Sequence, residues 1–402
     1  MLEPQERSGS QLPADLWTVP IAFLVPFPEY VFLSNGVRVI LDAALDAQSL
    51  GLNVCIVPSE DSRVLGTSLG EPYQNLRLRS EVPPGSFALI LDTISPSRLA
   101  ECRARCARIC HYALAPSGLL GERAYLANRV RLLAGERQAV YSPHVSTLIP
   151  SFYLQSRFDD LEVLIEQALR SDRATRYGQA SRQRLRACFY AGKGYLGPIP
   201  AALRARISRR HASLFTRHQP ASKQELYRQL SSADFLVCYD PMSSLAYESL
   251  LLGVPVYMEA EWDEPNFFAC FPVILDGLVF KDVAKFLDIL DHGFDHQRVV
   301  DSYRAALHSN RQTLIDLLHY AFVRDQSYVQ DAEVLNQYWD QRQSFFSSLR
   351  LPSPSSAWAP LTLALPPLNW RDHVHDFASK SRSAMSRFFA RIARRFMRFM
   401  TR

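Results

Sequence analysis

The sequence lacks an uninterrupted apolar run of the length that a membrane-spanning helix needs. Its first apolar stretch, residues 19–27, is interrupted by Pro20 and Pro26, whereas a spanning helix takes about 20 apolar residues. The first ten residues are polar and include acids, where a secretory signal would be basic. These features predict a cytoplasmic protein.

A nucleotide-binding P-loop is also absent, because the pattern Gly-x4-Gly-Lys-Ser/Thr occurs nowhere in the chain. This absence excludes an ATPase or kinase of the P-loop class. The seven cysteines are odd in number and show no disulfide-framework spacing, which predicts free thiols in a reducing compartment.

Three of the cysteines, Cys102, Cys106 and Cys110, are spaced four residues apart. On a helix predicted over residues 96–110 they would share one face. Structural zinc sites use two ligand pairs, and no second pair accompanies these thiols. We therefore expect a buried cysteine face, and we expect no metal. His111, the next residue, is a secondary candidate for a histidine that contacts a ligand.

The chain has 402 residues and is 48% hydrophobic and 21% charged, which suffices for two core-forming domains and a tail. The net charge of +5 is mild, so the composition does not call for a nucleic-acid partner.

The most informative stretch is SSADFLVCYDPMSSLAYESLLLGVPVYM, residues 231–258. Residues 235–239 form an apolar run that predicts a buried parallel strand. Residues 245–252 are helical in type and end at Gly253, a typical helix C-terminal glycine. A second strand is expected to begin at residue 254, so the stretch predicts a βαβ unit.

Polar residues occupy the ligand-facing positions of this unit. Ser243 and Ser244 lie at the predicted helix N-terminus, where free N–H groups and the dipole favour a phosphate. Glu248 follows one turn later, and seven residues separate it from Asp240 at the strand end. The alternative is structural: Ser243 and Asp240 cap the helix and the strand, and Glu248 is solvated.

This pattern resembles the nucleotide-sugar-binding segment of GT-B glycosyltransferases, in which many retaining members carry an acid, seven residues, a Glu and then Gly-x-Pro-Val. The resemblance implies that Glu248 holds the donor ribose, that Ser243 and Ser244 contact the diphosphate or sugar, and that Asp240 lies near the donor sugar. The first acid here is Asp rather than Glu. Capsule-type and sialyl-type transferases carry a similar Ser-Ser then Glu pattern, so the stereochemical outcome stays open.

The N-terminal half shows the same alternation. Strands are expected at residues 21–25, 53–57 and 86–91, with a helix over 37–50. Asn35 and Gly36 open that helix, and in GT-B enzymes the corresponding loop approaches the donor phosphates or the acceptor. His144 lies in a proline-punctuated segment at the expected domain junction. By the same resemblance it contacts the donor sugar or acts as a base; a surface loop histidine is the alternative.

A strand at residues 187–191 leads into Gly192, Lys193 and Gly194, the start of a G-x-G-x-x-G match. A dinucleotide fingerprint is one interpretation, and an NAD(P)-dependent oxidoreductase would follow from it. Pro198 and Pro200 disfavour the required helix. In the other interpretation, Lys193 binds the donor diphosphate while the glycines permit close backbone approach.

The predicted fold is α/β, with two Rossmann-like domains facing a cleft and a C-terminal amphipathic helix. The expected ranges are an acceptor domain at 17–155, a nucleotide-sugar donor domain at 156–350, a Pro/Ser-rich linker at 351–368 and a basic tail at 369–402. From residue 379 on, Phe and Met recur every three or four residues opposite an acid-free arginine face. Such a helix suits an anionic membrane surface at the inner face of the membrane, or else a neighbouring domain or subunit.

The sequence thus predicts a glycosyltransferase of the hexosyltransferase type. Its partners would be a nucleotide-sugar donor, as a substrate rather than a cofactor, and a glycan or lipid-linked acceptor. No Asp-x-Asp pair is present, which argues against a metal-dependent GT-A enzyme. A non-catalytic α/β nucleotide-binding protein is the further alternative.

Overall fold

The fold is that of a computed structural model covering the whole chain. The residues described are 12–26, 35–59, 69, 71–91, 94–114, 132–141, 149–171, 185–191, 199–216, 220, 222–240, 243–259, 273–322 and 332–337.

The chain forms two compact units. Of the described residues, those up to 159, 273–274 and those from 298 on form unit 1, and residues 160–259 and 275–297 form unit 2. The polypeptide therefore returns to unit 1 after completing unit 2. The predicted domain ranges did not include this return, because they assigned all of residues 156–350 to the second domain. Those ranges remain a prediction.

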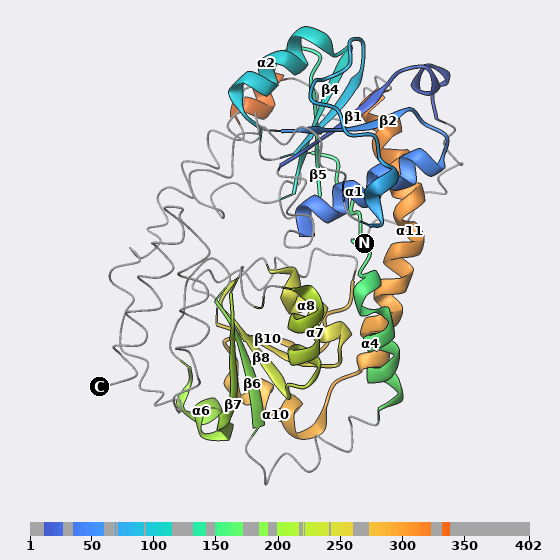
Figure 1. Ribbon diagram of the computed structural model, residues 1–402. Coiled ribbons are helices and arrows are strands. Elements are labelled where there is room, and N and C mark those ends of the chain that lie inside the picture. The colour runs from blue at the N-terminus through green and yellow to red at the C-terminus, as the bar shows by residue number, and fades with distance from the viewer. Residues whose placement is uncertain are drawn as a thin grey trace, which may run out of the picture. The chain divides into compact units, whose positions relative to one another are not determined.

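Unit 1 contains a five-stranded parallel sheet with the strand order β2-β1-β3-β4-β5 (Figure 1). The register pairs Ile21 with both Val54 and Phe87. All five residues of β1, β2 and β3 are buried, as expected of parallel strands covered on both faces. The strands are β1 (Ile21–Val25), β2 (Val54–Pro58), β3 (Phe87–Leu91), β4 (Arg108–Ala113) and β5 (Arg137–Val140).

The core of unit 1 joins this sheet to helices that are distant in the sequence. One cluster unites residues of β1, β2 and β3 with α1 (Asn35–Ser49) and with α11 (His296–Phe322). A second cluster packs α2 (Pro96–Arg105) against the sheet. The short 3-10 helices η1 (Ala14–Trp17) and η3 (Tyr73–Asn75) add Leu16 and Tyr73 to the first cluster.

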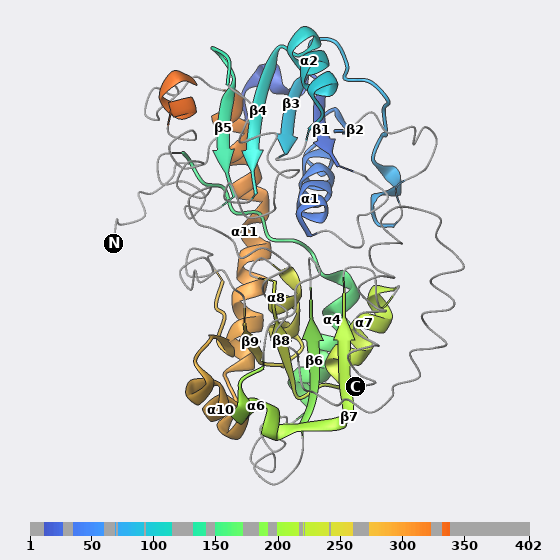
Figure 2. The same ribbon diagram turned by 90° about the vertical axis from the view of Figure 1, so that its left-hand side faces the viewer.

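Unit 2 contains a second five-stranded parallel sheet, with the order β10-β9-β8-β6-β7. Figure 2 shows β6 and β7 side by side and pointing the same way. The strands are β6 (Leu185–Tyr190), β7 (Ile207–Phe215), β8 (Phe235–Cys238), β9 (Val256–Met258) and β10 (Leu278–Phe280).

The helices of unit 2 are α4 (Asp159–Arg170), α6 (Ala201–Arg206), α7 (Lys223–Ser231), α8 (Ser244–Leu251) and α10 (Val283–His292). Leu203 of α6 and Phe286 and Leu290 of α10 pack with Phe235 and Val237 of β8 in one core cluster. Alternate β8 residues thus enter this cluster, in the period of two that a strand imposes.

The two sheets share one topology. Counted from the first strand of each unit, the order is 2-1-3-4-5 in both, which is the order of flavodoxin-like doubly wound folds. The predicted α/β class with two Rossmann-like sheets is therefore confirmed. The cleft and the C-terminal helix stay predictions.

Candidate functional site

The site candidates of unit 2 follow the two strands at which the strand order reverses. From β6 the chain crosses to β7 on one side, and β8 then lies on the other side of β6. In open α/β sheets, ligands bind outside the carboxyl ends of the strands at this switch point. Ala191 follows β6, Asp240 follows β8 by two residues, and Tyr239 N donates to Tyr190 O at 3.1 Å. Both loops therefore begin at one point of the sheet edge.

Helix α8 begins beside this edge as the sequence predicts. Ser243 is its N-cap, and its Oγ accepts a hydrogen bond from Leu245 N at 3.1 Å. Gly253, with a φ of 70°, follows the last turn, where a left-handed backbone ends a helix. Ser243 thus has the capping role, and Ser244 is the first helical residue.

Asp240 lies in the short connection between β8 and α8 and is 7% exposed. Its carbonyl oxygen accepts from the Cys238 thiol at 3.3 Å and from Ser243 N at 3.4 Å. These contacts fix the backbone of Asp240 between the strand and the helix cap, so the residue begins the connection in a defined position.

Glu248 is buried in α8, with 2% of its surface exposed. Its Oε2 accepts a hydrogen bond from the Tyr227 phenol at 2.8 Å, and its Oε1 lies 4.0 Å from Lys223 Nζ. The structural alternative of a solvated Glu248 is therefore wrong. The sequence analysis missed Tyr227 and Lys223. The only available signal was the spacing of four residues from Lys223 to Tyr227, which does not point to Glu248.

The remaining candidates divide by location. Asn35 and Gly36 begin α1 after β1 in unit 1, as predicted. Two sets of candidates lie outside the described residues. They are His144 and the glycine segment with Gly192, Lys193 and Gly194, and their roles stay predictions.

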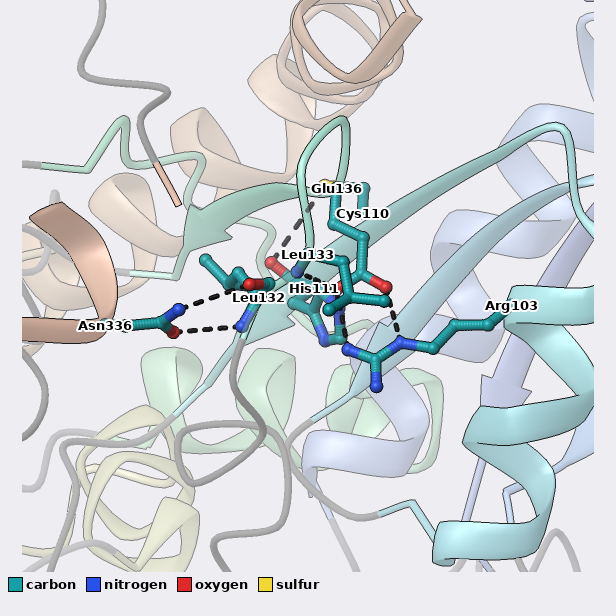
Figure 3. A network of polar contacts seen from close by, with 7 residues as sticks. All are labelled: Arg103, Cys110, His111, Leu132, Leu133, Glu136 and Asn336. Carbon is teal, nitrogen blue, oxygen red and sulfur yellow. Dashed lines mark hydrogen bonds and ion pairs between the residues drawn. The ribbon is translucent and has the colours of Figure 1, made fainter. Parts of the chain in front are cut away.

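His111 is fully buried in the middle of β4 and belongs to a polar network (Figure 3). Its Nε2 lies 3.2 Å from Glu136 Oε2, and Arg103 binds both Glu136 oxygens at 2.7 and 3.0 Å. Leu133 N donates to the same carboxylate. Burial would raise the pKa of Glu136, but the hydrogen bonds from His111 and Arg103 outweigh it and lower the pKa to about 2. His111 therefore ties β4 to the start of β5, and a role for it as a ligand-contacting histidine is not supported.

The predicted cysteine face is wrong in its geometry. Helix α2 ends at Arg105, Cys106 is its C-cap with extended backbone angles, and Cys110 lies in β4. The three thiols therefore do not share a helix face, although Cys102 and Cys110 are fully buried. Burial raises the pKa of Cys110 to about 12, which keeps this thiol neutral. Within the described ranges, no group of three or more His, Cys, Asp or Glu residues could hold a metal ion.

The dinucleotide alternative finds no support in the neighbourhood of β6. The first helix that the structure describes after β6 is α6, which begins at Ala201 with Pro200 as its N-cap; residues 192–198 lie outside the described part of the chain. The adjacent strand β7 ends at Phe215 and is followed by Thr-Arg-His-Gln. The acid that would bind a dinucleotide ribose there is missing.

Among the described helices, none combines the length and hydrophobicity that crossing a membrane requires.

Comparisons with known proteins give structural likenesses only. No family model and no curated protein matches the chain. Among solved structures, the apo lipopolysaccharide outer core galactosyltransferase WaaB is similar over 76% of this chain and 100% of its own, at 11% identity and a TM-score of 0.45.

Sucrose-phosphate synthase from Thermosynechococcus elongatus is similar over 82% of this chain and 100% of its own, at 13% identity and a TM-score of 0.41. A putative UDP-N-acetylglucosamine 2-epimerase from Listeria monocytogenes is similar over 83% and 98%, at 11% identity and a TM-score of 0.36. Likenesses at this level do not identify an activity.

Proposed function

We propose that this protein is a nucleotide-sugar-dependent glycosyltransferase that binds its donor in unit 2 and uses no metal ion. The observation that carries the proposal is the buried Glu248 carboxylate, one turn into α8 beside the switch point of the sheet. Side chains of a helix tilt toward its N-terminus, so this carboxylate is directed toward the edge from which Asp240 extends.

Each donor residue has a distinct task in this proposal. Glu248 accepts a hydrogen bond from a ribose hydroxyl. Lys193, together with amides at the start of α8, neutralises the diphosphate, which supports departure of a charged leaving group. Asp240 lies near the sugar.

In the reaction, the bond between the anomeric carbon and the diphosphate oxygen breaks, and an acceptor hydroxyl oxygen forms the new bond. The hydroxyl proton passes to a base, for which His144 is the candidate from the sequence. The transferred group is a hexosyl unit, and the acceptor is a glycan or a lipid-linked molecule. Asn35 and Gly36 would approach the acceptor or the donor phosphates from the start of α1.

The place of action in this proposal is the cytoplasmic face of a membrane. The support is the acid-free, arginine-rich sequence of residues 379–402, which favours an anionic surface. These residues lie outside the described part of the chain.

A ligand screen tests the proposal against its two alternatives. Thermal shift and calorimetry would compare UDP-, GDP-, CMP- and dTDP-linked sugars with NAD and NADP. We expect a nucleotide sugar to bind and to be turned over. Preferential binding of NAD or NADP would favour the oxidoreductase, and donor binding without turnover for any acceptor would favour a non-catalytic protein.

Two variants test the assigned residues. Glu248→Ala should weaken donor binding by about 1.5–3 kcal/mol, the usual size of a hydrogen bond to a charged group, whereas Glu225→Ala, which removes an acid paired with Arg228 on α7, should not. Lys193→Ala should weaken binding of the nucleoside diphosphate more than that of the nucleoside. Equal weakening of both ligands would contradict a phosphate contact.

A further inference from the structure

Helix α7 presents two residues of one face to the Glu248 carboxylate. Tyr227, which is fully buried, donates its phenol hydrogen to Oε2 at 2.8 Å. Lys223 lies one turn earlier, with Nζ 4.0 Å from Oε1 and 5.6 Å from the centre of the Tyr227 ring. The spacing of four residues brings both groups to the same side of the helix.

The two carboxylate oxygens of Glu248 therefore differ. The phenol holds Oε2 at a direct hydrogen-bond distance. The ammonium group of Lys223 lies farther from Oε1 than the 2.7–3.2 Å of an N–H···O hydrogen bond, so it offsets the charge while Oε1 keeps its acceptor capacity. A carboxylate has about four acceptor positions.

The buried carboxylate of Glu248 needs a hydrogen-bond donor and a nearby positive charge. A buried carboxylate is strongly disfavoured unless it is paired and hydrogen-bonded. Tyr227 and Lys223 supply both kinds of partner from α7, and they also fix the orientation of the carboxylate on the neighbouring helix α8. Ser244, one turn before Glu248, is half-buried at the start of α8, so the side chain of Glu248 tilts toward the partly open end of the helix.

We propose that Tyr227 is a positioning residue for nucleotide binding, which fixes Oε2 of Glu248 so that Oε1, beside Lys223, accepts a ribose hydroxyl. This role rests on the proposed function and goes beyond it by assigning the accepting atom and the residue that orients it. The ligand class is a ribonucleoside diphosphate, and one of its two ribose hydroxyls makes the contact.

The test compares ligands that differ by one hydroxyl. The probe is whichever of UDP, GDP, ADP and CDP binds the full-length protein most tightly, together with its 2′-deoxy and 3′-deoxy forms. Loss of the contacted hydroxyl should weaken binding to the wild type about tenfold or more. Tyr227→Phe should weaken binding of the ribonucleotide by about 3- to 10-fold, as for coupled neighbouring groups, and leave unchanged the binding of the form that lacks the contacted hydroxyl.

Tyr73→Phe is the matched control. Tyr73 is also a buried tyrosine that donates to a buried carboxylate, Asp42, at 2.7 Å, but it lies in unit 1. The Tyr73→Phe substitution should not change the affinity for the ribonucleotide or for its 2′-deoxy and 3′-deoxy forms. Equal weakening of all three ligands by Tyr227→Phe, or the same effect from Tyr73→Phe, would overturn the role of Tyr227.

A second variant covers the case in which Tyr227→Phe does not fold. In Glu248→Gln the amide oxygen can still accept from the Tyr227 phenol, which places the NH₂ group, a donor only, at the Oε1 position. The NH₂ group can only donate to the hydroxyl oxygen and carries no charge, so this variant should show a reduced preference for the ribonucleotide. Full retention of that preference would refute the assignment of Oε1. If no nucleoside diphosphate binds the wild type, the proposed function itself fails, and this role fails with it.

Discussion

Asp42 should make the stability of unit 1 depend on pH in a direction that is unusual for a carboxylate. It lies on α1 and is 2% exposed. Tyr73 donates to its Oδ1 at 2.7 Å, and Arg157 N donates to its Oδ2 at 2.8 Å. Burial raises the pKa of Asp42 to about 6, and it outweighs the hydrogen bonds from Arg157 and Tyr73 and the charges of Arg157 and Arg38, all of which lower it.

The sign and size follow from linkage. Because the pKa in the folded state lies above the reference value of 3.8, the folded protein binds the proton more tightly. This contribution to stability is complete below pH 3.8 and is lost as the pH rises through about 6. A difference of about two pKa units corresponds to about 3 kcal/mol.

Urea unfolding of the wild type and Asp42→Asn, measured between pH 4 and 7, isolates this contribution. The variant carries no titrating group at this position, and its amide satisfies only one of the two donors. It should therefore lose about 1–3 kcal/mol at low pH and show a flatter pH dependence. Tyr73→Phe removes a bond that favours the ionised form, so it should raise the pKa of Asp42 further. Identical pH dependence in the wild type and Asp42→Asn would refute the reasoning.

Two further predictions concern other charged groups. Glu136→Gln should lower the free energy of unfolding by about 1.5–3 kcal/mol in chemical denaturation, because Arg103 and His111 lose a charged partner. Since the pKa of Glu136 is lowered to about 2, the stabilisation by Glu136 is present above pH 4.5 and is lost as the pH falls through about 2. An unchanged free energy of unfolding of Glu136→Gln at neutral pH would contradict this prediction. Removing residues 379–402 should release the protein from anionic vesicles in co-sedimentation. Each arginine should contribute about 1 kcal/mol to the free energy of vesicle binding, and this contribution should fade in high salt. Conversion of a dimer to a monomer by the truncation would instead indicate a subunit contact.

The sequence predicted those elements whose signals are local. The strand expected at 21–25 has the bounds of β1, and the helix expected at 245–252 corresponds to α8 with its Ser243 cap and Gly253 end. Apolar runs, a capping serine and a terminating glycine act within a few residues, so the sequence alone reveals them.

The elements that were missed depend on distant partners. Strand β5 begins with Arg137 and Gln138, and both side chains are buried. No apolar run in the sequence therefore predicts this strand. Arg137 donates to the carbonyl of Tyr320, and the Tyr320 phenol donates to the carbonyl of Gln138 at 2.9 Å. Contacts across more than 180 residues satisfy these polar groups, and no local pattern encodes them. The Tyr227–Glu248 contact escaped prediction for the same reason.

The shared strand order of the two units allows their switch points to be compared residue by residue. In unit 1 the third strand, β3, leads to the cap Ser95 of α2, which accepts from Arg98 N as Ser243 accepts from Leu245 N.

Five residues after each cap, the two units differ. Unit 2 has the buried Glu248, and unit 1 has Ala100. The nearest acid in unit 1, Glu101, receives Val82 N at 2.8 Å and pairs with Arg98, so its carboxylate is occupied by the unit's own chain. A buried carboxylate one turn past the cap therefore exists at only one of these two equivalent positions. Under the proposed function, this asymmetry favours nucleotide binding in unit 2. Asn35 and Gly36, which begin α1 in unit 1, would then approach the donor phosphates or the acceptor.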